Sequence, residues 1–204
     1  MLAALQGLFS SPAWDAVPIW ALDLELGGLD PLRDPILSVG MLPIRGGRIR
    51  LGEAWTSLVR PQGAVRPESI RAHQLVAADL AAAPELDAVL PEIDRRMREG
   101  ALLVHVTRID VAFLREAYRR TGLRWPGVPV VDTADLVQRV ARREAAGAPE
   151  LAENVVVQLG AARAAHGLPD YPAHDPLSDA LASAELFLVL RAKLGARKLR
   201  DLAR

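Results

Sequence analysis

The chain of 204 residues contains no cysteine and no long apolar run. Without cysteine it cannot form a disulfide scaffold, bind zinc through thiolates or use a cysteine nucleophile. No stretch of about 18 apolar residues occurs, so the sequence predicts no membrane span. The first fifteen residues make a poor secretory signal, because they lack a basic flank and Gln6 and Gly7 interrupt their apolar stretch. We therefore expect a cytoplasmic protein with no membrane partner.

An excess of charge of either sign is also absent. Lys+Arg and Asp+Glu are both 25, so the formal net charge is zero and no global field attracts a polyanion. Lys193 and Lys198 are the two lysines, and we attribute the many arginines to a compositional bias of the source genome. A neutral chain can still bind nucleic acid where metal ions supply positive charge, so composition leaves the substrate open.

The length suits one α/β domain, and no repeat or linker divides the chain. Strands come first, and helices and strands then alternate, which predicts a mixed sheet with helices on both faces. We expect strands at 17–25, 35–45, 48–61, 101–106 and 128–131, and helices at 84–99, 108–122, 132–144, 153–167 and 176–195. Gly46-Gly47 predicts a tight hairpin turn, and Thr107 is the expected N-cap of the helix at 108–122.

The ends of the chain have a different character from its middle. We expect residues 16–195 to form the domain, with 1–15 as an N-terminal extension and 196–204 as a basic C-terminal tail.

Two carboxylates share one face of the first expected strand. Asp23 and Glu25 are two residues apart and point to the same side, whereas Trp20, Leu22 and Leu24 point to the other. Such a pair repels unless something positive lies between its members, and a divalent cation that prefers oxygen ligands fits there. The alternative is an acidic strand end that is simply solvated.

Two further acidic groups lie at helix starts, each preceded by a histidine. Asp110 follows the apolar strand at 101–106, and His105 lies near the end of that strand. Asp179 falls in the first turn of the last helix and His174 in the loop before it, with Asp175 as the expected N-cap. Acidic residues stabilise helix N-termini, but α/β folds also bind ligands at these strand ends, so both interpretations stay open.

Together these segments form an ordered set that resembles the motifs of the DEDDh 3′-5′ exonucleases, the family of the proofreading subunit of bacterial DNA polymerase III. WALDLELGGLDP is similar to the first motif, LVHVTRIDVAFL to the second and HDPLSDALASAELF to the third. The resemblance covers about residues 17–192. It implies a ribonuclease H-like α/β fold, with a mixed five-stranded sheet flanked by helices.

The resemblance also implies a chemistry. Asp23, Glu25, Asp110 and Asp179 would hold two divalent cations, Mg²⁺ or Mn²⁺, with Asp23 between them. His174 would be the general base, because imidazole can accept a proton near neutral pH. The activity implied is release of nucleoside 5′-monophosphates from DNA 3′ ends, single-stranded ends being favoured, in proofreading or repair beside a polymerase or repair partner.

Five residues are candidates for contact with the substrate. Gly28 and Leu29 match the positions where the family's backbone and an apolar wedge meet the terminal base. His73, His105 and Phe113 are further candidates by the same resemblance. The alternatives are that Leu29 and Phe113 belong to the core and that His73 is a surface histidine.

The chain departs from the family at four positions, and other functions stay open. Leu26 and Gly27 replace two threonines, Val106 replaces an asparagine and Pro176 replaces an alanine, which puts substrate handling and full activity in question. One alternative function is a 3′-5′ exoribonuclease of the same family. Another is a non-catalytic accessory module that keeps the fold.

Overall fold

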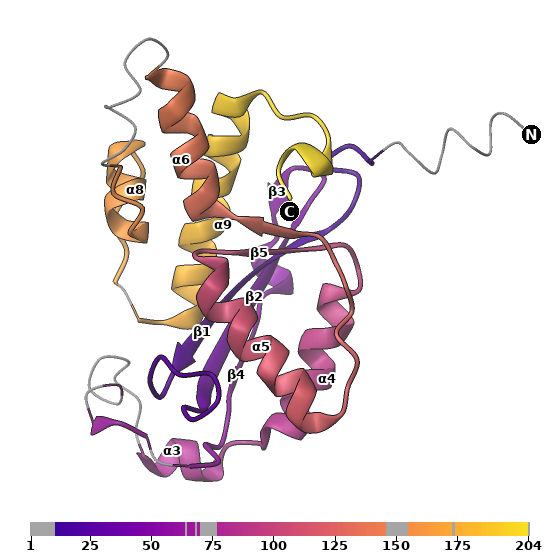
Figure 1. Cartoon of the computed structure of the whole chain (residues 1–204), viewed down its shortest axis with the longest axis vertical. Helices are drawn as coiled ribbons and strands as arrows, with labels where there is room; N and C mark the ends of the chain where they lie inside the picture. The colour runs from indigo at the N-terminus through magenta and orange to yellow at the C-terminus, as the bar shows by residue number, and fades with distance from the viewer. Residues whose placement is uncertain are drawn as a thin grey trace, which may run out of the picture.

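The structure is a computed structural model that describes residues 11–63, 65–67, 69, 77–145, 155–172 and 174–203. One mixed sheet runs through it in the order β3-β2-β1-β5-β6, with β4 also paired to β2 (Figure 1). The strands are β1 (Ile19–Leu26), β2 (Ile36–Arg45), β3 (Arg48–Ile49), β4 (Trp55–Leu58), β5 (Ala101–Val104) and β6 (Val130–Asp132). The helices are α3 (Ala77–Ala82), α4 (Leu86–Met97), α5 (Thr107–Thr121), α6 (Thr133–Glu144), α8 (Leu159–Ala165) and α9 (Pro176–Leu194), with short 3₁₀ turns η1 (Leu51–Glu53) and η2 (Leu199–Asp201).

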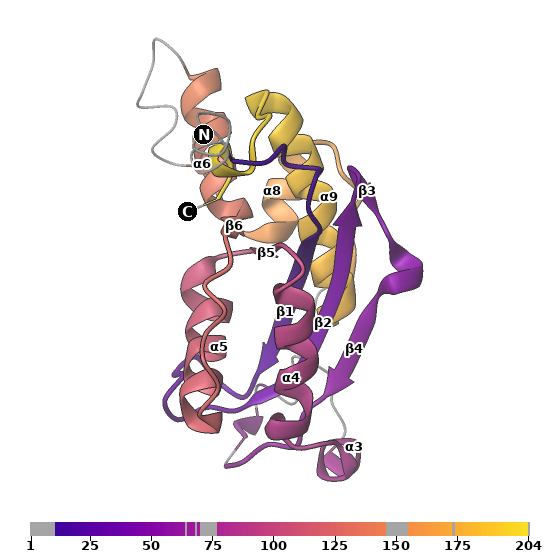
Figure 2. The same ribbon diagram turned by 90° about the vertical axis from the view of Figure 1, so that its right-hand side faces the viewer.

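The sheet has six strands where the sequence predicted five. The single strand expected at 48–61 is divided by η1 into β3 and β4, which both pair antiparallel with β2 (Figure 2). Gly46 and Gly47 form the predicted turn with φ angles of 56° and 73°. β1 joins this antiparallel half to a parallel half, because it pairs antiparallel with β2 and parallel with β5. The mixed α/β fold is confirmed.

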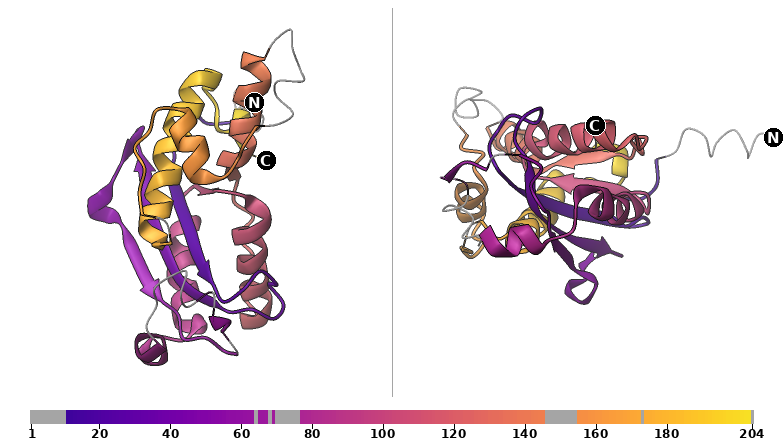
Figure 3. Two further views of the ribbon diagram at one scale, coloured as in Figure 1. Left: turned by 90° about the vertical axis from the view of Figure 1, so that its left-hand side faces the viewer. Right: turned by 90° about the horizontal axis from the view of Figure 1, so that it is seen from below.

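Each face of the sheet has its own apolar core. Trp20 and Leu22 of β1 pack with α4 and α5 on one face. Ile19 and Ala21 pack with α6, α8 and α9 on the other. Figure 3 shows α9 lying along β1 and β2. The period-two alternation of β1 therefore places the Asp23 and Glu25 side chains on the α9 face, opposite the face that the tryptophan and leucines fill.

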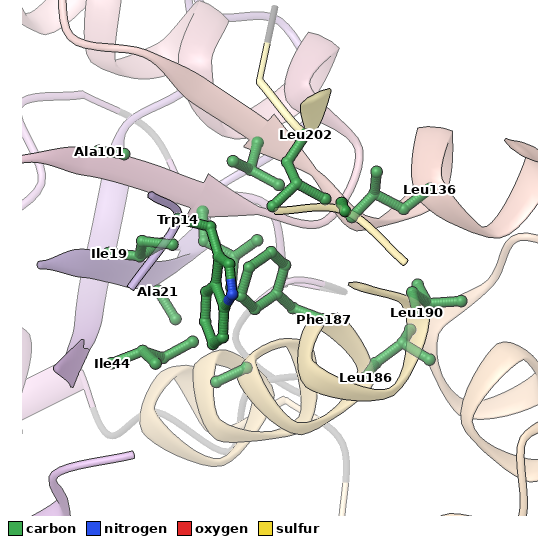
Figure 4. Packing of buried hydrophobic residues seen from close by; sticks show 14 of the residues in the cluster. Trp14, Ile19, Ala21, Ile44, Ala101, Leu136, Leu186, Phe187, Leu190 and Leu202 are labelled. Carbon is green, nitrogen blue, oxygen red and sulfur yellow. The ribbon is translucent and has the colours of Figure 1, made fainter. Parts of the chain in front are cut away.

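The described parts of the expected extension and tail belong to the fold. Trp14 packs edge-on against Phe187 of α9 with ring centroids 5.8 Å apart, and Figure 4 shows the pair with Leu202 nearby. Leu199 and Leu202 are 4% and 1% exposed in the same core. Burial of these large apolar groups holds the segments around Trp14 and around Leu199 and Leu202 against the domain.

Two local expectations differ from the structure. α5 begins at Thr107 itself, so Val106 takes the N-cap position, and the side chain of Asp132 accepts hydrogen bonds from the backbone N–H groups of Val106 and Thr107. Of the helix expected at 153–167, residues 155–158 are not helical, α8 covers Leu159–Ala165 and 153–154 lie outside the described residues. Among the described helices, none combines the length and the apolar character that crossing a bilayer requires.

Candidate active site

Three of the four expected metal ligands meet at one point. One carboxylate oxygen from each of Asp23, Glu25 and Asp179 lies within 4.8 Å of the other two. Asp23 and Glu25 come from β1, and Asp179 comes from the first turn of α9, which covers that face of the sheet. Three carboxylate oxygens at this spacing suit a Mg²⁺- or Mn²⁺-type cation, which prefers oxygen ligands.

A glycine on β2 lets α9 come this close. Gly40 is the residue directly opposite Asp23 in the β1–β2 ladder. A Cβ atom at Gly40 would overlap the Pro176 carbonyl group and the Leu177 nitrogen. Asp175 caps the helix by accepting the Ser178 N–H at 2.8 Å, as expected. The first turn of α9 therefore rests directly on the sheet beside the carboxylates of β1.

Asp110 lies near the same carboxylates, but it belongs to α5, which packs on the other face of the sheet from α9. The parallel pairing of β1 and β5 ends at Ala21 and Leu103, so the following part of β1 faces the first turn of α5. Asp110 is 4% exposed and accepts a hydrogen bond from the Leu24 N–H, next to Asp23. Burial, followed by the charge of Asp110, raises the pKa of Asp23. The fourth carboxylate is thus close enough to Asp23 and Glu25 for their charges to act on one another.

Burial and mutual repulsion raise the pKa values of these carboxyl groups above their ordinary range. Burial, then the charges of Asp179 and Asp175, raises the pKa of Glu25 to about 7. Burial raises the pKa of Asp110 to about 8, and burial and the neighbouring carboxylates raise that of Asp23 well above its usual value. A cluster that must either take up protons or hold a cation is typical of functional sites.

His174 lies at the entrance of the acidic cluster. Its backbone adopts a left-handed conformation, with φ at 72°, and its backbone N–H donates to Asp179 Oδ2 at 2.8 Å. The side chain is exposed in the loop that precedes α9. The general-base candidate is therefore tied to a metal-ligand candidate through the main chain, while its ring remains accessible.

His105 is half-buried and lines the same cleft. Its Nδ1 lies 2.7 Å from Thr133 Oγ1, and that hydroxyl donates to the Val104 carbonyl oxygen. Because the hydroxyl proton is used there, Nδ1–H is the donor to Thr133 and Nε2 carries the lone pair. Burial lowers the pKa of His105, which favours this neutral form.

A cleft of about 760 Å³ opens in front of these groups, and Asp23, Asp179, His105 and His174 line it. The lining of the cleft also contains a buried arginine that no sequence pattern singled out. Arg163 is 2% exposed, donates to the carboxylate of Glu185 at 2.9 Å and stacks over the Tyr171 ring at 4.5 Å. Arg163 is one of many arginines, so no spacing signal distinguishes it.

Ser38 is a second residue that sequence reasoning missed. It pairs directly with Glu25 across the β1–β2 ladder and is 3% exposed. Its buried hydroxyl has no hydrogen-bond partner among the described residues. Only the strand register could have placed this hydroxyl beside a carboxylate, and the register depends on how the hairpin folds.

The other candidates for contact with the substrate lie in different environments. Gly28 and Leu29 lie in the loop that leaves β1, and the Leu29 side chain is 78% exposed rather than in the core. Phe113 is 3% exposed, packs in the core beneath α5 and lines a smaller cavity of about 150 Å³ away from the acidic cluster. The Phe113 ring packs in this core, as the core alternative describes, and its contact with the substrate stays a prediction. His73 lies outside the described residues.

Comparisons with known proteins show the family of this chain. A family model described as Exonuclease (RNase_T) matches residues 20–187. A DNA polymerase III subunit epsilon-like protein of Rhodobacter capsulatus is 32% identical over 190 residues, which are 91% of this chain and 25% of that protein. A PolC-type DNA polymerase III of Thermotoga maritima is 26% identical over 185 residues, which are 89% of this chain and 12% of that protein. This chain therefore spans a quarter or less of the length of these two relatives.

Solved structures give the same fold. Exonuclease I of E. coli in complex with a dT13 oligonucleotide superposes with a TM-score of 0.73 at 15% identity, over 88% of this chain and 42% of that one. At this identity the likeness shows the ribonuclease H-like fold.

Proposed function

This chain belongs to the RNase_T exonuclease family, and from that premise we propose that it is a 3′-5′ exonuclease that releases nucleoside 5′-monophosphates from the 3′ ends of single-stranded DNA. The observation that carries the proposal is the convergence of Asp23, Glu25 and Asp179 within 4.8 Å, with Asp110 beside Asp23. These four side chains come from three separate parts of the sequence. Their convergence has no structural benefit in the absence of a cation, since like charges destabilise one another.

The donor set fits two divalent cations. Asp23, Glu25 and Asp179 would hold one, and Asp23 with Asp110 would hold the other. Such cations, Mg²⁺ or Mn²⁺, stabilise charge on the phosphate and on the leaving 3′-oxygen and acidify the attacking water. With four carboxylates against two dications, the loaded site would be close to neutral and could accept the phosphodiester.

His174 acts in this proposal as the general base. Its ring is exposed at the mouth of the cleft, and its backbone N–H is fixed to Asp179. The imidazole would take the proton from the attacking water and return it to solvent. His105, whose Nδ1 is held by Thr133, lines the same cleft, and we propose that its ring contacts the substrate there.

Single-stranded DNA is the substrate we propose, because the similar fold of Exonuclease I is seen with DNA oligonucleotides. RNA is the alternative within the same chemistry. A polymerase or repair partner and a cytoplasmic location stay predictions; relatives named as DNA polymerase III components are consistent with the former.

The test is digestion of matched DNA and RNA oligomers carrying a 5′ label, with Mg²⁺, with Mn²⁺ and after chelation. We expect a metal-dependent ladder that shortens from the 3′ end, faster on DNA. Asp179→Asn should abolish it. Asp175→Asn is the matched control, because asparagine also caps helices, and it should retain activity. Faster digestion of RNA would favour the exoribonuclease, and no digestion of either would favour the non-catalytic module.

A further inference from the structure

The loop that joins α8 to α9, residues 166–175, carries His174 near its end. Asp170, Tyr171 and His174 of this loop line the cleft in front of the acidic cluster. The structure describes every residue of the loop except Ala173, and none of those described is in a helix or strand. Backbone without regular secondary structure opens easily unless other contacts hold it. The position of His174 therefore depends on what fixes this loop.

Arg163, in the last turn of α8, joins the first half of the loop to α9. Its Nη2 donates to the Pro169 carbonyl oxygen at 2.8 Å, and its Nη1 donates to the Ala182 carbonyl oxygen at 2.7 Å. The same Nη2 donates to Glu185 Oε2 at 2.9 Å. Pro169 precedes His174 in the chain, whereas Ala182 and Glu185 follow it. One guanidinium group therefore closes the segment that contains His174 from both sides.

A tyrosine of the loop makes a second connection to the same glutamate. The Tyr171 hydroxyl donates to Glu185 Oε1 at 3.0 Å, and the Arg163 guanidinium carbon lies 4.5 Å from the centroid of the Tyr171 ring. Arg163 is 2% exposed, and a charge buried to this degree is costly unless it is paired and hydrogen-bonded. Movement of the loop would take acceptors away from this buried charge, so the network favours one position of the loop.

The second half of the loop is held by α9 itself. The His174 N–H donates to Asp179 Oδ2 at 2.8 Å, and the Asp175 side chain accepts the Ser178 N–H at 2.8 Å. A loop held only at this end could still swing about the main chain of His174, and the imidazole would move with it. The bonds from Arg163 remove that freedom, because they hold the chain that leads to His174.

We infer that Arg163 is a positioning residue that keeps the His174 imidazole at the acidic cluster by tying the preceding part of the loop to α9. The inference rests on the proposed function, because His174 is the general base only in that proposal. Misplacement of a reacting group by about 1 Å can cost about 10²-fold in rate. Arginine suits this role, because its planar guanidinium group can bond several acceptors at once in a fixed geometry, which a lysine ammonium group cannot do.

Arg96 provides a matched control. Like Arg163 it is buried, at 8% exposed, it pairs with a glutamate, Glu92, at 2.6 Å, and it stacks on an aromatic ring, that of Trp55, at 4.3 Å. It lies in α4, which packs on the other face of the sheet from α9, and it is not among the residues that line the cleft. Arg163→Lys and Arg96→Lys therefore make the same chemical change in similar surroundings, but only Arg163→Lys releases the loop.

The first experiment measures kcat and KM for digestion of single-stranded DNA in Mg²⁺. We expect Arg163→Lys to lower kcat about 10- to 100-fold relative to Arg96→Lys, with KM unchanged. The same two substitutions are then made in the His174→Asn protein. There Arg163→Lys should cause no further loss of kcat relative to Arg96→Lys, because the imidazole that it positions is already absent.

The second experiment needs no reaction. Hydrogen exchange of the His174 N–H, measured by NMR in the metal-free protein, reports how often its bond to Asp179 opens. We expect this N–H to exchange about fivefold faster or more in Arg163→Lys than in Arg96→Lys, as loss of a hydrogen bond typically gives.

A milder pair of variants keeps the test decisive if Arg163→Lys does not fold. Tyr171→Phe removes the bond to Glu185 and keeps the ring on the guanidinium group. Tyr118→Phe is its control, because it also removes one tyrosine–carboxylate bond, to Asp94 of α4. We expect Tyr171→Phe to lower kcat about two- to tenfold relative to Tyr118→Phe, and only where His174 is present.

Equal kcat values for the two arginine variants, or equal exchange rates of the His174 N–H, would overturn the inference. A further loss of kcat caused by Arg163→Lys in the His174→Asn protein would overturn it as well, because the arginine would then act on something other than the imidazole. Failure of the proposed function is a separate result. The wild-type chain would then not shorten DNA in Mg²⁺, whereas the exchange measurement would still test whether Arg163 holds the loop.

Discussion

Gly40 lies directly opposite Asp23 in the ladder between β1 and β2, and the first turn of α9 rests on the space that a side chain would fill. The position of Asp179 relative to Asp23 therefore depends on a glycine, which has no side chain that could bind a metal or a substrate. Close packing of backbone on backbone leaves no room for a methyl group without displacing the helix.

Gly40→Ala should weaken metal binding. The added Cβ atom would push Pro176 and Leu177 from the sheet and move Asp179 away from Asp23 and Glu25. We expect the affinity for Mn²⁺, measured by calorimetry, to fall about 10- to 100-fold, as is typical when a group that orients a ligand is changed. Gly52→Ala is the control, because a Cβ atom there meets nothing within 4 Å. Unchanged Mn²⁺ affinity in a folded Gly40→Ala protein would contradict this role.

The stability of the metal-free protein should fall as the pH rises. Asp110 and Glu25 have pKa values of about 8 and about 7 in the folded protein, whereas both ionise near pH 4 when the chain is unfolded. Raised pKa values mean that the folded state retains protons that the unfolded state releases. The contribution of these two groups to the free energy of unfolding is therefore largest below about pH 4 and falls steadily as the pH rises to about 8.

Thermal melts with a chelator test this. We expect Tm at pH 8 to be lower than at pH 5 by at least about 4 °C, and Mg²⁺ to restore it. In Asp110→Asn the decline should be smaller, because that position no longer titrates. An unchanged Tm between pH 5 and pH 8 without metal would show that the pKa values of these carboxyl groups are not raised in the folded protein.

His174→Asn should separate catalysis from metal binding. Asparagine tolerates the left-handed backbone found at position 174, so the hydrogen bond from this backbone N–H to Asp179 should persist. Loss of a general base typically lowers the rate about 10²–10⁴-fold. We expect that loss in single-turnover kinetics, with Mn²⁺ affinity unchanged. A rate equal to that of the wild type would point to His105 as the base.

Val106→Asn should stabilise the protein. Val106 has φ at 68° and ψ at 73°, a region that β-branched residues rarely adopt, at a cost of about 1–3 kcal/mol. We expect Tm to rise by about 2–4 °C or more. Val106→Gly relieves the backbone without adding a polar side chain and should account for much of the gain. A lower Tm in both variants would mean that packing of the valine outweighs the strain, and a large gain in activity with Asn would mark this chain as a weakened enzyme.

Local patterns in the sequence predicted the parts of the structure that depend on neighbouring residues. The alternation along β1 placed Asp23 and Glu25 on one face because strand geometry repeats every two residues. The first turn of α9 placed Asp179 beside its cap, Asp175, for a similar local reason. The convergence of the motifs came from a resemblance to a family, not from local physics.

Features that depend on distant contacts were not predicted. Trp14 was assigned to an extension, although it packs on Phe187 near the other end of the chain. Thr107 was expected to cap α5, but Asp132 satisfies the helix start from the next strand. Arg163 gives no signal in the sequence, because two of its partners are backbone carbonyl groups. Burial of this kind is decided by the tertiary arrangement.

Anomalous diffraction from crystals soaked with Mn²⁺ and a nucleoside 5′-monophosphate tests the central claim most directly. The account predicts two Mn²⁺ peaks about 3.5–4 Å apart, one between Asp23, Glu25 and Asp179 and one between Asp23 and Asp110, with the phosphate touching both. Manganese bound elsewhere, or a carboxylate of this set directed away from the peaks, would contradict it.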